Sequence, residues 1–153
     1  MHPSKSIIFF TVSSGTGYGI LLCLSYLAFV TDINFDSNVK LLLMITSFVF
    51  ISAGLLSSTL HLGHPERAWR SFSQWKSSWL SREGLAAVVT FLPLMIFYLF
   101  WYLDSFFYIY FLHSTSILCL ITIYCTGQMY ATLKTIPAWN NKLVTPIYTI
   151  NSI

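Results

Sequence analysis

Charged residues are scarce in this sequence: Asp, Glu, Lys and Arg make up 8% of its 153 residues, whereas apolar residues make up 56%. Soluble domains carry roughly 25% charged residues, so the composition excludes an ordinary water-soluble domain. The net charge of +3 could suggest a nucleic acid as partner, but the positions of the charges matter more than their sum, and we expect no nucleic acid. We therefore expect lipid to surround most of the chain.

Cysteine is also rare, and its spacing excludes the common metal sites. The three cysteines, Cys23, Cys119 and Cys125, lie in apolar segments without a C-x-x-C pair or a neighbouring cluster of His and Cys. Zinc and iron-sulfur sites need several such ligands at short spacing. We therefore expect no iron-sulfur cluster in this chain, and free thiols packed between helices. The glycines of S-G-T-G-Y-G lack the strand and βαβ unit of a dinucleotide-binding loop, which excludes that function too.

Four stretches contain no Asp, Glu, Lys or Arg: residues 6–31, 41–60, 84–103 and 105–133. Each has the roughly 20 residues that a helix needs to cross about 30 Å of hydrocarbon. Backbone groups in lipid must be hydrogen-bonded internally, which favours helices. We predict an all-α integral membrane bundle with four transmembrane helices at about residues 7–30, 41–60, 84–103 and 106–131. The first stretch lacks a small-x-small cleavage site, so we expect it to be kept, and a fifth helix is expected to start near Pro146.

The polar connection over residues 61–83 is where we expect specific chemistry. Four spans bring both termini to the same side as this connection, so most basic residues gather on one face of the protein: Lys5, Arg67, Arg70, Lys76, Arg82, Lys134 and Lys142, with Lys40 on the other face. Four of the five tryptophans mark the basic face, and Trp101 belongs to the opposite one. Such a face is typical of a membrane interface that sets topology. It would equally suit the docking of an acidic peripheral partner.

Two protonatable residues flank this connection. His61 directly follows the second helix, and a histidine at the membrane boundary can exchange protons or hydrogen-bond a quinone oxygen. The alternative is a histidine that interacts only with the helix C-terminus. Glu83 opens the third predicted helix, where the helix dipole alone favours a carboxylate. Because the second and third helices form a hairpin, His61 and Glu83 are also expected at one depth, which suits proton-coupled chemistry.

Two further features lie within the predicted spans. Gly15 and Gly19 have the small-xxx-small spacing that predicts close helix packing, with close approach of a cofactor ring as the alternative. His113 differs in depth from His61 by about 20 Å at 1.5 Å per residue, so the two cannot ligate one haem. We therefore expect no haem, and a packing role for His113.

Three stretches carry a family resemblance. They are M-H-P-S-K-S-I-I-F-F-T-V-S-S-G-T-G-Y-G, S-S-T-L-H-L-G-H-P-E-R-A-W-R-S-F-S-Q-W-K-S-S-W-L-S-R-E-G and Y-C-T-G-Q-M-Y-A-T-L-K-T-I-P-A-W-N-N. Spread over nearly the whole chain, they resemble the dimethyl sulfoxide reductase membrane anchor family. The combination of H-L-G-x-P-x-R-A with S-R-E-G is the most specific part of the match.

The resemblance implies a multi-pass subunit of the bacterial inner membrane that acts in anaerobic respiration. It would oxidise menaquinol or another quinol and pass the electrons to an iron-sulfur subunit, which feeds a molybdopterin-containing catalytic subunit. The anchor itself would carry no metal, and the resemblance assigns quinol binding and oxidation to His61 and Glu83. Family members have about eight spanning helices, so this chain would be the N-terminal half of such an anchor, a single transmembrane domain over residues 1–153.

The resemblance places the N-terminus and the quinol site, and hence the basic face, in the periplasm, whereas the positive-inside rule places that face in the cytoplasm. From the residues themselves we infer a docking rim for the iron-sulfur subunit, with salt-sensitive association: Arg67, Arg70, Lys76 and Arg82. Two other functions are weighed against this one. The first is a truncated structural tether without quinol activity. The second is a small dimerising transporter, against which no charged residue lies in the predicted spans.

Overall fold

The structure of the 153-residue chain is a computed structural model that describes residues 5–31, 35–60, 65–132, 139 and 141–152. Within these ranges the side chains of residues 5–7, 59–60, 65–68 and 71 are not described. The described part contains helices and no strand. In chain order its elements are α1 (Lys5–Val30), α2 (Ser37–Leu60), the 3-10 helix η1 (Pro65–Gln74), α3 (Trp79–Tyr102), α4 (Tyr108–Ala131) and α5 (Val144–Asn151).

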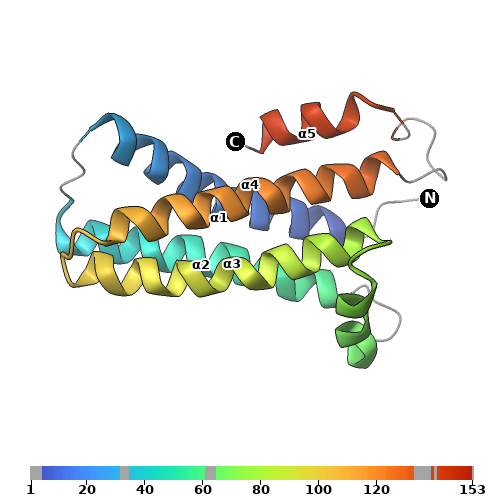
Figure 1. Ribbon diagram of the computed structural model, residues 1–153, viewed down its shortest axis with the longest axis horizontal. Coiled ribbons are helices and arrows are strands. Elements are labelled where there is room, and N and C mark those ends of the chain that lie inside the picture. Colours follow the sequence, from blue (N-terminus) through green and yellow to red (C-terminus); the bar gives the residue numbers. More distant parts are fainter. Residues whose placement is uncertain (1–4, 32–34, 61–64, 133–138, 140, 153) are drawn as a thin grey trace.

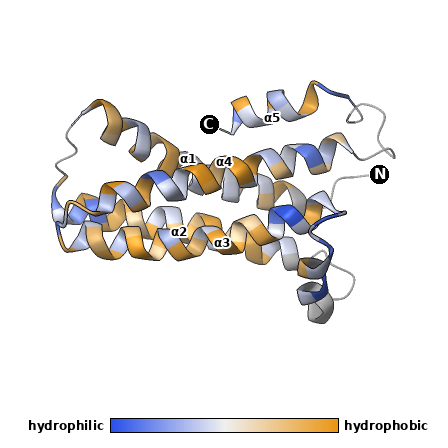
Figure 2. Ribbon diagram, in the orientation of Figure 1, coloured by the Kyte–Doolittle hydropathy of each residue, from blue (hydrophilic) through white to orange (hydrophobic). Residues whose placement is uncertain are grey.

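The four long helices α1 to α4 lie side by side along the long axis of the molecule (Figure 1). All four are long and apolar enough to cross a membrane. Their outer faces present large apolar side chains such as Phe29 and Leu92, which are 82% and 72% exposed, and Figure 2 shows how hydrophobic these helices are along most of their length. Such a surface is stable only in lipid. The predicted all-α bundle with four spans is confirmed, and the protein is a multi-pass membrane protein.

Two helices begin earlier than the sequence predicts. α2 starts at Ser37 and includes Lys40, and α3 starts at Trp79, where the Ser78 hydroxyl accepts a hydrogen bond from the Ser81 amide at 3.4 Å. Glu83 therefore lies in the second turn of α3, and the prediction that it opens the helix is wrong. The reason is physical: a run without charges marks the part of a helix that lies in hydrocarbon, whereas the helix itself continues into the interface.

The helices pack as two hairpins, α1 with α2 and α3 with α4. Contacts between α1 and α4 join the hairpins, and α5 runs back along the C-terminal part of α4 (Figure 1). Hydrogen bonds link the two hairpins: the buried hydroxyls of Ser47 and Tyr98 lie 2.6 Å apart, and Ser25 Oγ lies 2.7 Å from His113 Nδ1 in a partly buried contact. Such polar contacts hold helices together in lipid, where hydrophobic burial contributes little. The His113 contact agrees with the packing role predicted for this residue.

Close packing of α1 against α2 involves glycines other than the predicted pair. A Cβ atom added at Gly17 would lie 2.5 Å from Ile51 Cγ1, and one added at Gly54 would lie 2.8 Å from a backbone nitrogen of α1. At Gly15 an added Cβ would meet nothing within 4 Å, and at Gly19 only a backbone oxygen 3.8 Å away. The prediction that Gly15 and Gly19 mediate close helix packing is therefore wrong within the described part of the chain.

The cysteines divide in the same way. Cys119 and Cys125 are buried free thiols, as expected, but Cys23 is exposed on the outer face of α1, so the expectation that it packs between helices is wrong. A helix that is apolar on every side does not reveal from its sequence which side faces its neighbours.

Candidate functional site

The most unusual buried group is the carboxylate of Glu83, near the end of the bundle from which η1 projects. Glu83 is 4% exposed, and its Oε1 accepts a hydrogen bond of 2.7 Å from Thr126 Oγ1 of α4. Its second oxygen, Oε2, has no hydrogen-bond partner in the described part of the chain. An isolated buried carboxylate is costly, so an unpartnered oxygen in this position calls for a functional explanation.

Three tyrosines from three helices lie within electrostatic range of Glu83. The phenols of Tyr18 in α1, Tyr130 in α4 and Tyr148 in α5 each interact electrostatically with its carboxylate. The rings of Tyr130 and Tyr148 lie 5.7 Å apart between centroids. Together with Thr126 these residues form a buried polar cluster, which we call the Glu83 cluster: Tyr18, Glu83, Thr126, Tyr130 and Tyr148.

Two phenols of the Glu83 cluster have distinct properties. Tyr18 is 3% exposed, and its hydroxyl has no hydrogen-bond partner among the described residues. Tyr148 lies outside the four long helices, and burial, followed by the nearby Glu83, raises the pKa of its phenol to about 12. The phenol of Tyr148 therefore keeps a proton that can be donated to a neighbouring oxygen.

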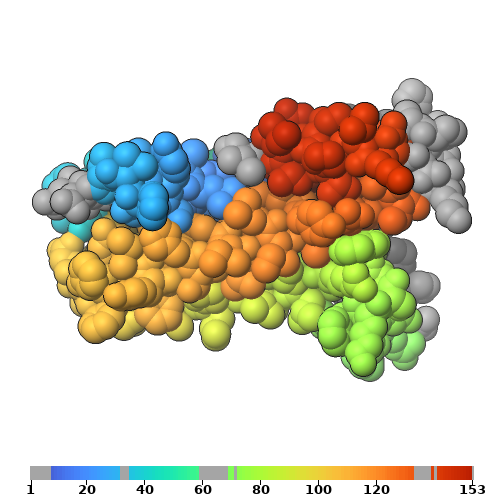
Figure 3. Space-filling model, turned by 45° about the horizontal axis from the view of Figure 1, so that its top comes forward, coloured from blue at the N-terminus to red at the C-terminus, as the bar shows by residue number. Residues whose placement is uncertain are grey.

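A groove of about 650 Å³ runs between α1 and α5 beside this cluster. Gly15 and Gly19 form part of its α1 wall, and Ile147, Tyr148 and Ser152 line the opposite side. Figure 3 shows α5 seated against α4. The two glycines that sequence spacing singled out therefore leave open space next to the Glu83 cluster, in place of a helix contact. Whether a cofactor ring approaches them, as in the second of the two predicted roles, stays a prediction.

The connection between α2 and α3 forms an aromatic surface with basic residues at its edge. Trp69 and Trp75 are 66% and 48% exposed, the Arg70 guanidinium lies 5.5 Å from the Trp69 ring centroid, and the Lys76 ammonium lies 5.7 Å from that of Trp75. With the exposed Phe72, these residues make up what we call the aromatic-basic platform: Trp69, Arg70, Phe72, Trp75 and Lys76.

The other residues of the predicted docking rim differ from one another. Arg82 stacks 4.3 Å from the Trp79 ring centroid and donates hydrogen bonds to the carbonyl oxygens of Trp75 and Lys76, at 2.8 and 2.7 Å. Its guanidinium thus holds the turn between η1 and α3 in shape. The side chain of Arg67 and the whole of His61 lie outside the described residues, so the pairing of His61 with Glu83 stays a prediction.

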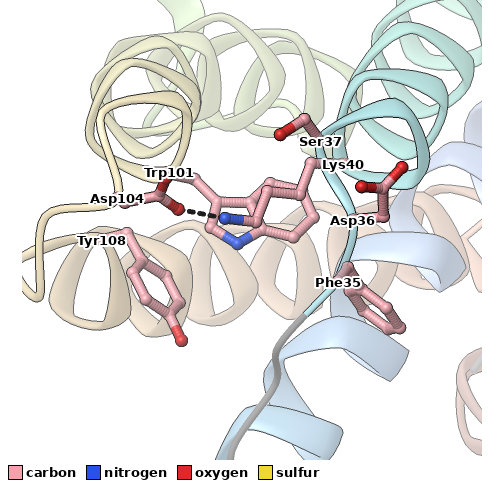
Figure 4. A pocket seen from close by; sticks show the side chains of 7 residues that line it. All are labelled: Phe35, Asp36, Ser37, Lys40, Trp101, Asp104 and Tyr108. Carbon is pink, nitrogen blue, oxygen red and sulfur yellow. Dashed lines mark hydrogen bonds and ion pairs between the residues drawn. The ribbon is translucent and has the colours of Figure 1, made fainter.

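The opposite end of the bundle carries a second pocket, of about 410 Å³ (Figure 4). An ion pair between Lys40 of α2 and Asp104, in the turn between α3 and α4, closes one side of it. Trp101, 2% exposed, forms its apolar wall and lies at this end as the sequence predicts. Asp104 has a φ of 50°, which is uncommon for a residue other than glycine. Sequence reasoning missed this pocket, although opposite charges near the ends of two predicted spans on one face, Lys40 and Asp104, were a usable signal.

Metal ligands do not cluster in the described part of the chain, where no group of three His, Cys, Asp or Glu side chains could hold a metal ion. The predictions that the chain holds neither haem nor an iron-sulfur cluster concern all residues, and they stay predictions.

A bundle of four spanning helices, with a buried carboxylate near an end rich in tryptophan and basic residues, defines a multi-pass membrane protein. The chain belongs to the DMSO reductase anchor subunit (DmsC) family, whose sequence profile matches residues 1–153. This membership confirms the resemblance inferred from the motifs.

One curated relative is a sulfite dehydrogenase subunit from Allochromatium vinosum, which is 41% identical over 99 residues. That alignment covers 54% of this chain and 27% of the relative, so the matched segment spans about a quarter of the relative's length. No solved structure matches the chain.

Proposed function

We propose that this chain is part of the membrane anchor of a molybdenum-containing oxidoreductase in the bacterial inner membrane, and that it binds and oxidises a membrane quinol beside Glu83. The observation that carries the proposal is the buried Glu83 carboxylate, with one oxygen held by Thr126 and the other without a partner in the described part of the chain. Family membership supports the role of anchor.

The chemistry suits this arrangement. Oxidation of a quinol breaks its two O–H bonds and yields the quinone, two protons and two electrons. Glu83 accepts one proton at Oε2, while Thr126 keeps the carboxylate oriented through Oε1. His61, which follows the second span in the sequence, accepts the other proton and passes it to water at the interface. The electrons leave to the iron-sulfur cluster of a partner subunit, which feeds a molybdopterin-containing catalytic subunit.

The aromatic-basic platform supports docking of that partner at the same end of the bundle. Arg70 and Lys76 are exposed cations over tryptophan rings, and such rims steer acidic partners and make their association salt-sensitive. Arg67 would add to the rim from η1. Electrons would then have a short path from the Glu83 cluster to the iron-sulfur cluster of the docked partner.

The reverse electron flow, reduction of a quinone, is the second candidate. It is favoured by the relative's being part of a sulfite dehydrogenase, because a dehydrogenase releases electrons that need an acceptor. The same residues serve both directions, since Glu83 and His61 then deliver the protons that the quinone takes up. The redox couple of the catalytic partner decides between the two.

The test compares variants in membranes that contain the chain together with its partner subunits. Glu83→Gln and His61→Ala are expected to abolish reduction of the terminal acceptor by added menadiol, at unchanged levels of assembled complex. Asp104→Asn is the matched control, because it neutralises a carboxylate that is 75% exposed at the opposite end of the bundle. Wild-type rates in both Glu83→Gln and His61→Ala would leave a purely structural tether as the function.

A further inference from the structure

We propose that the hydroxyl of Tyr18 binds the same quinol hydroxyl that Glu83 deprotonates. This inference rests on the proposed function and extends it to Tyr18 of α1, which lies in the first family-like stretch but to which the sequence assigned no role. It starts from two oxygens, Tyr18 Oη and Glu83 Oε2, which are the buried side-chain atoms without a hydrogen-bond partner in the described part of the chain.

Both oxygens belong to one buried cluster. Tyr18 and Glu83 are 3% and 4% exposed, they come from α1 and α3, and the two groups interact electrostatically. A buried polar atom without a partner destabilises the fold, and two in one cluster are better explained by a ligand that satisfies both.

The two groups together offer one hydrogen-bond donor and one acceptor, which is what a ligand hydroxyl needs. The phenol of Tyr18 donates a proton, and the ionised carboxylate of Glu83 only accepts. A quinol hydroxyl accepts a hydrogen bond with its oxygen and donates one with its hydrogen. One such hydroxyl bonded to Tyr18 Oη and Glu83 Oε2 would therefore give each of these atoms a hydrogen-bond partner. A water molecule can donate and accept in the same way, and variants of Tyr18 distinguish a bound water from a bound quinol.

The groove between α1 and α5 provides space for the rest of the ligand. Tyr18 stands three residues after Gly15 and immediately before Gly19, so it lies on the helix face next to the groove wall that these glycines form. The groove volume of about 650 Å³ is within the range of about 300–1,000 Å³ that small-molecule sites have. Tyr148 lines the groove and also interacts with Glu83, which ties the groove to the Glu83 cluster.

Tyr98 is the matched control for Tyr18. It is also a buried tyrosine of a spanning helix, but its hydroxyl already has a partner, Ser47 Oγ at 2.6 Å. Removing the hydroxyl of Tyr98 therefore breaks a bond within the protein, whereas removing that of Tyr18 breaks one only when a ligand is bound.

The experiment measures Tyr18→Phe and Tyr98→Phe in the assembled complex, with menadiol as the electron donor. For Tyr18→Phe we expect a KM for menadiol raised about tenfold, as for the loss of one hydrogen bond to the ligand. Its kcat should change less, and its thermal midpoint without menadiol should not fall. For Tyr98→Phe we expect a lower thermal midpoint and an unchanged KM.

An unchanged KM in Tyr18→Phe would overturn the inference. If that result came with a lowered thermal midpoint without menadiol, the hydrogen-bond partner of the Tyr18 hydroxyl is a buried water. Failure of Tyr18→Phe to assemble would overturn the inference too, because an unpartnered hydroxyl is not needed for folding. Loss of the proposed function itself would be seen separately, as menadiol-dependent turnover that survives Glu83→Gln.

Discussion

Thr126 is the residue on which the geometry of Glu83 depends. Its hydroxyl donates the hydrogen bond to Oε1, and Thr126→Val removes this donor while nearly keeping the side-chain volume. The carboxylate would then lose its protein partner, and we expect the free energy of unfolding to fall by about 1–3 kcal/mol. Thermal or denaturant unfolding of the purified complex in detergent measures this change.

Thr122 provides the control for that substitution. It is 2% exposed and lies one turn earlier in α4, and within the described residues its hydroxyl bonds only the Leu118 carbonyl of its own helix. Thr122→Val should therefore lower the free energy of unfolding by less than Thr126→Val does. Equal losses of stability in the two variants would mean that the contact with Glu83 contributes nothing of its own.

Sequence reasoning singled out one member of the Glu83 cluster. Glu83 stood out because it ends the polar connection and belongs to the S-R-E-G stretch that carries the family resemblance. Thr126 and Tyr18 were not predictable, because Thr126 lies 43 residues away from Glu83 in the chain and both belong to spans that are apolar on every side. Such helices give no sequence signal for the face that turns inward, so the partners of a buried charge become visible only in the packed bundle.

At the scale of helices, the contact of α1 with α2 depends on Gly17. Gly17→Ala would place a Cβ atom 2.5 Å from Ile51 Cγ1 and 2.9 Å from the Ile51 amide nitrogen, so the two backbones would have to move apart. Overpacking of this kind costs about 1–3 kcal/mol. We expect the thermal midpoint of Gly17→Ala to fall, whereas Gly15→Ala, whose Cβ would meet nothing within 4 Å, should keep the midpoint of the wild type.

The two glycine variants also separate packing from ligand binding. If Gly15→Ala lowered the midpoint as much as Gly17→Ala, Gly15 would face a helix after all, and the groove beside it would not be open. The sequence carries the i, i+4 spacing of Gly15 and Gly19, which satisfies the small-xxx-small rule. The rule identifies residues that permit close approach of another helix. Which of them contact a helix depends on where the neighbouring helix lies, and α2 packs on the other face of α1.

Element boundaries follow the same logic. The existence and order of the four spans were predictable from charge-free runs, since each run covers the hydrocarbon thickness. The start of α3 at Trp79 was not, because its first two turns include Ser81, Arg82 and Glu83, and a helix can continue into the interface without being apolar. That difference moves Glu83 from a helix end into the second turn, where it reaches Thr126 of α4.

For the whole molecule, the two ends of the bundle differ in chemistry. One end carries η1 with the aromatic-basic platform and lies near the Glu83 cluster, and the other carries Lys40 paired with Asp104 (Figures 1 and 4). This difference between the two ends was predictable, because an even number of spans separates the basic segments and so places them at the same end. Its direction across the membrane was not, because the positive-inside rule and the family resemblance place the basic end on opposite sides.

Cysteine labelling decides the direction. Ser73 in η1 and Asn38 in the first turn of α2 are exposed at opposite ends of the bundle. We expect Ser73→Cys to react with a membrane-impermeant maleimide in intact cells, and Asn38→Cys to react only after permeabilisation, because the family resemblance places the basic end in the periplasm. The unsubstituted chain measures the background from Cys23, Cys119 and Cys125, which all lie within spans.

The opposite labelling pattern would place the platform in the cytoplasm. The basic residues would then follow the positive-inside rule, and Arg70 and Lys76 would need no partner to explain them. A proton accepted by Glu83 would leave toward the cytoplasm instead of the periplasm, so quinol oxidation at this site would not contribute to the proton gradient. The labelling pattern therefore decides the side on which an iron-sulfur partner could dock and the energetic consequence of the proposed chemistry.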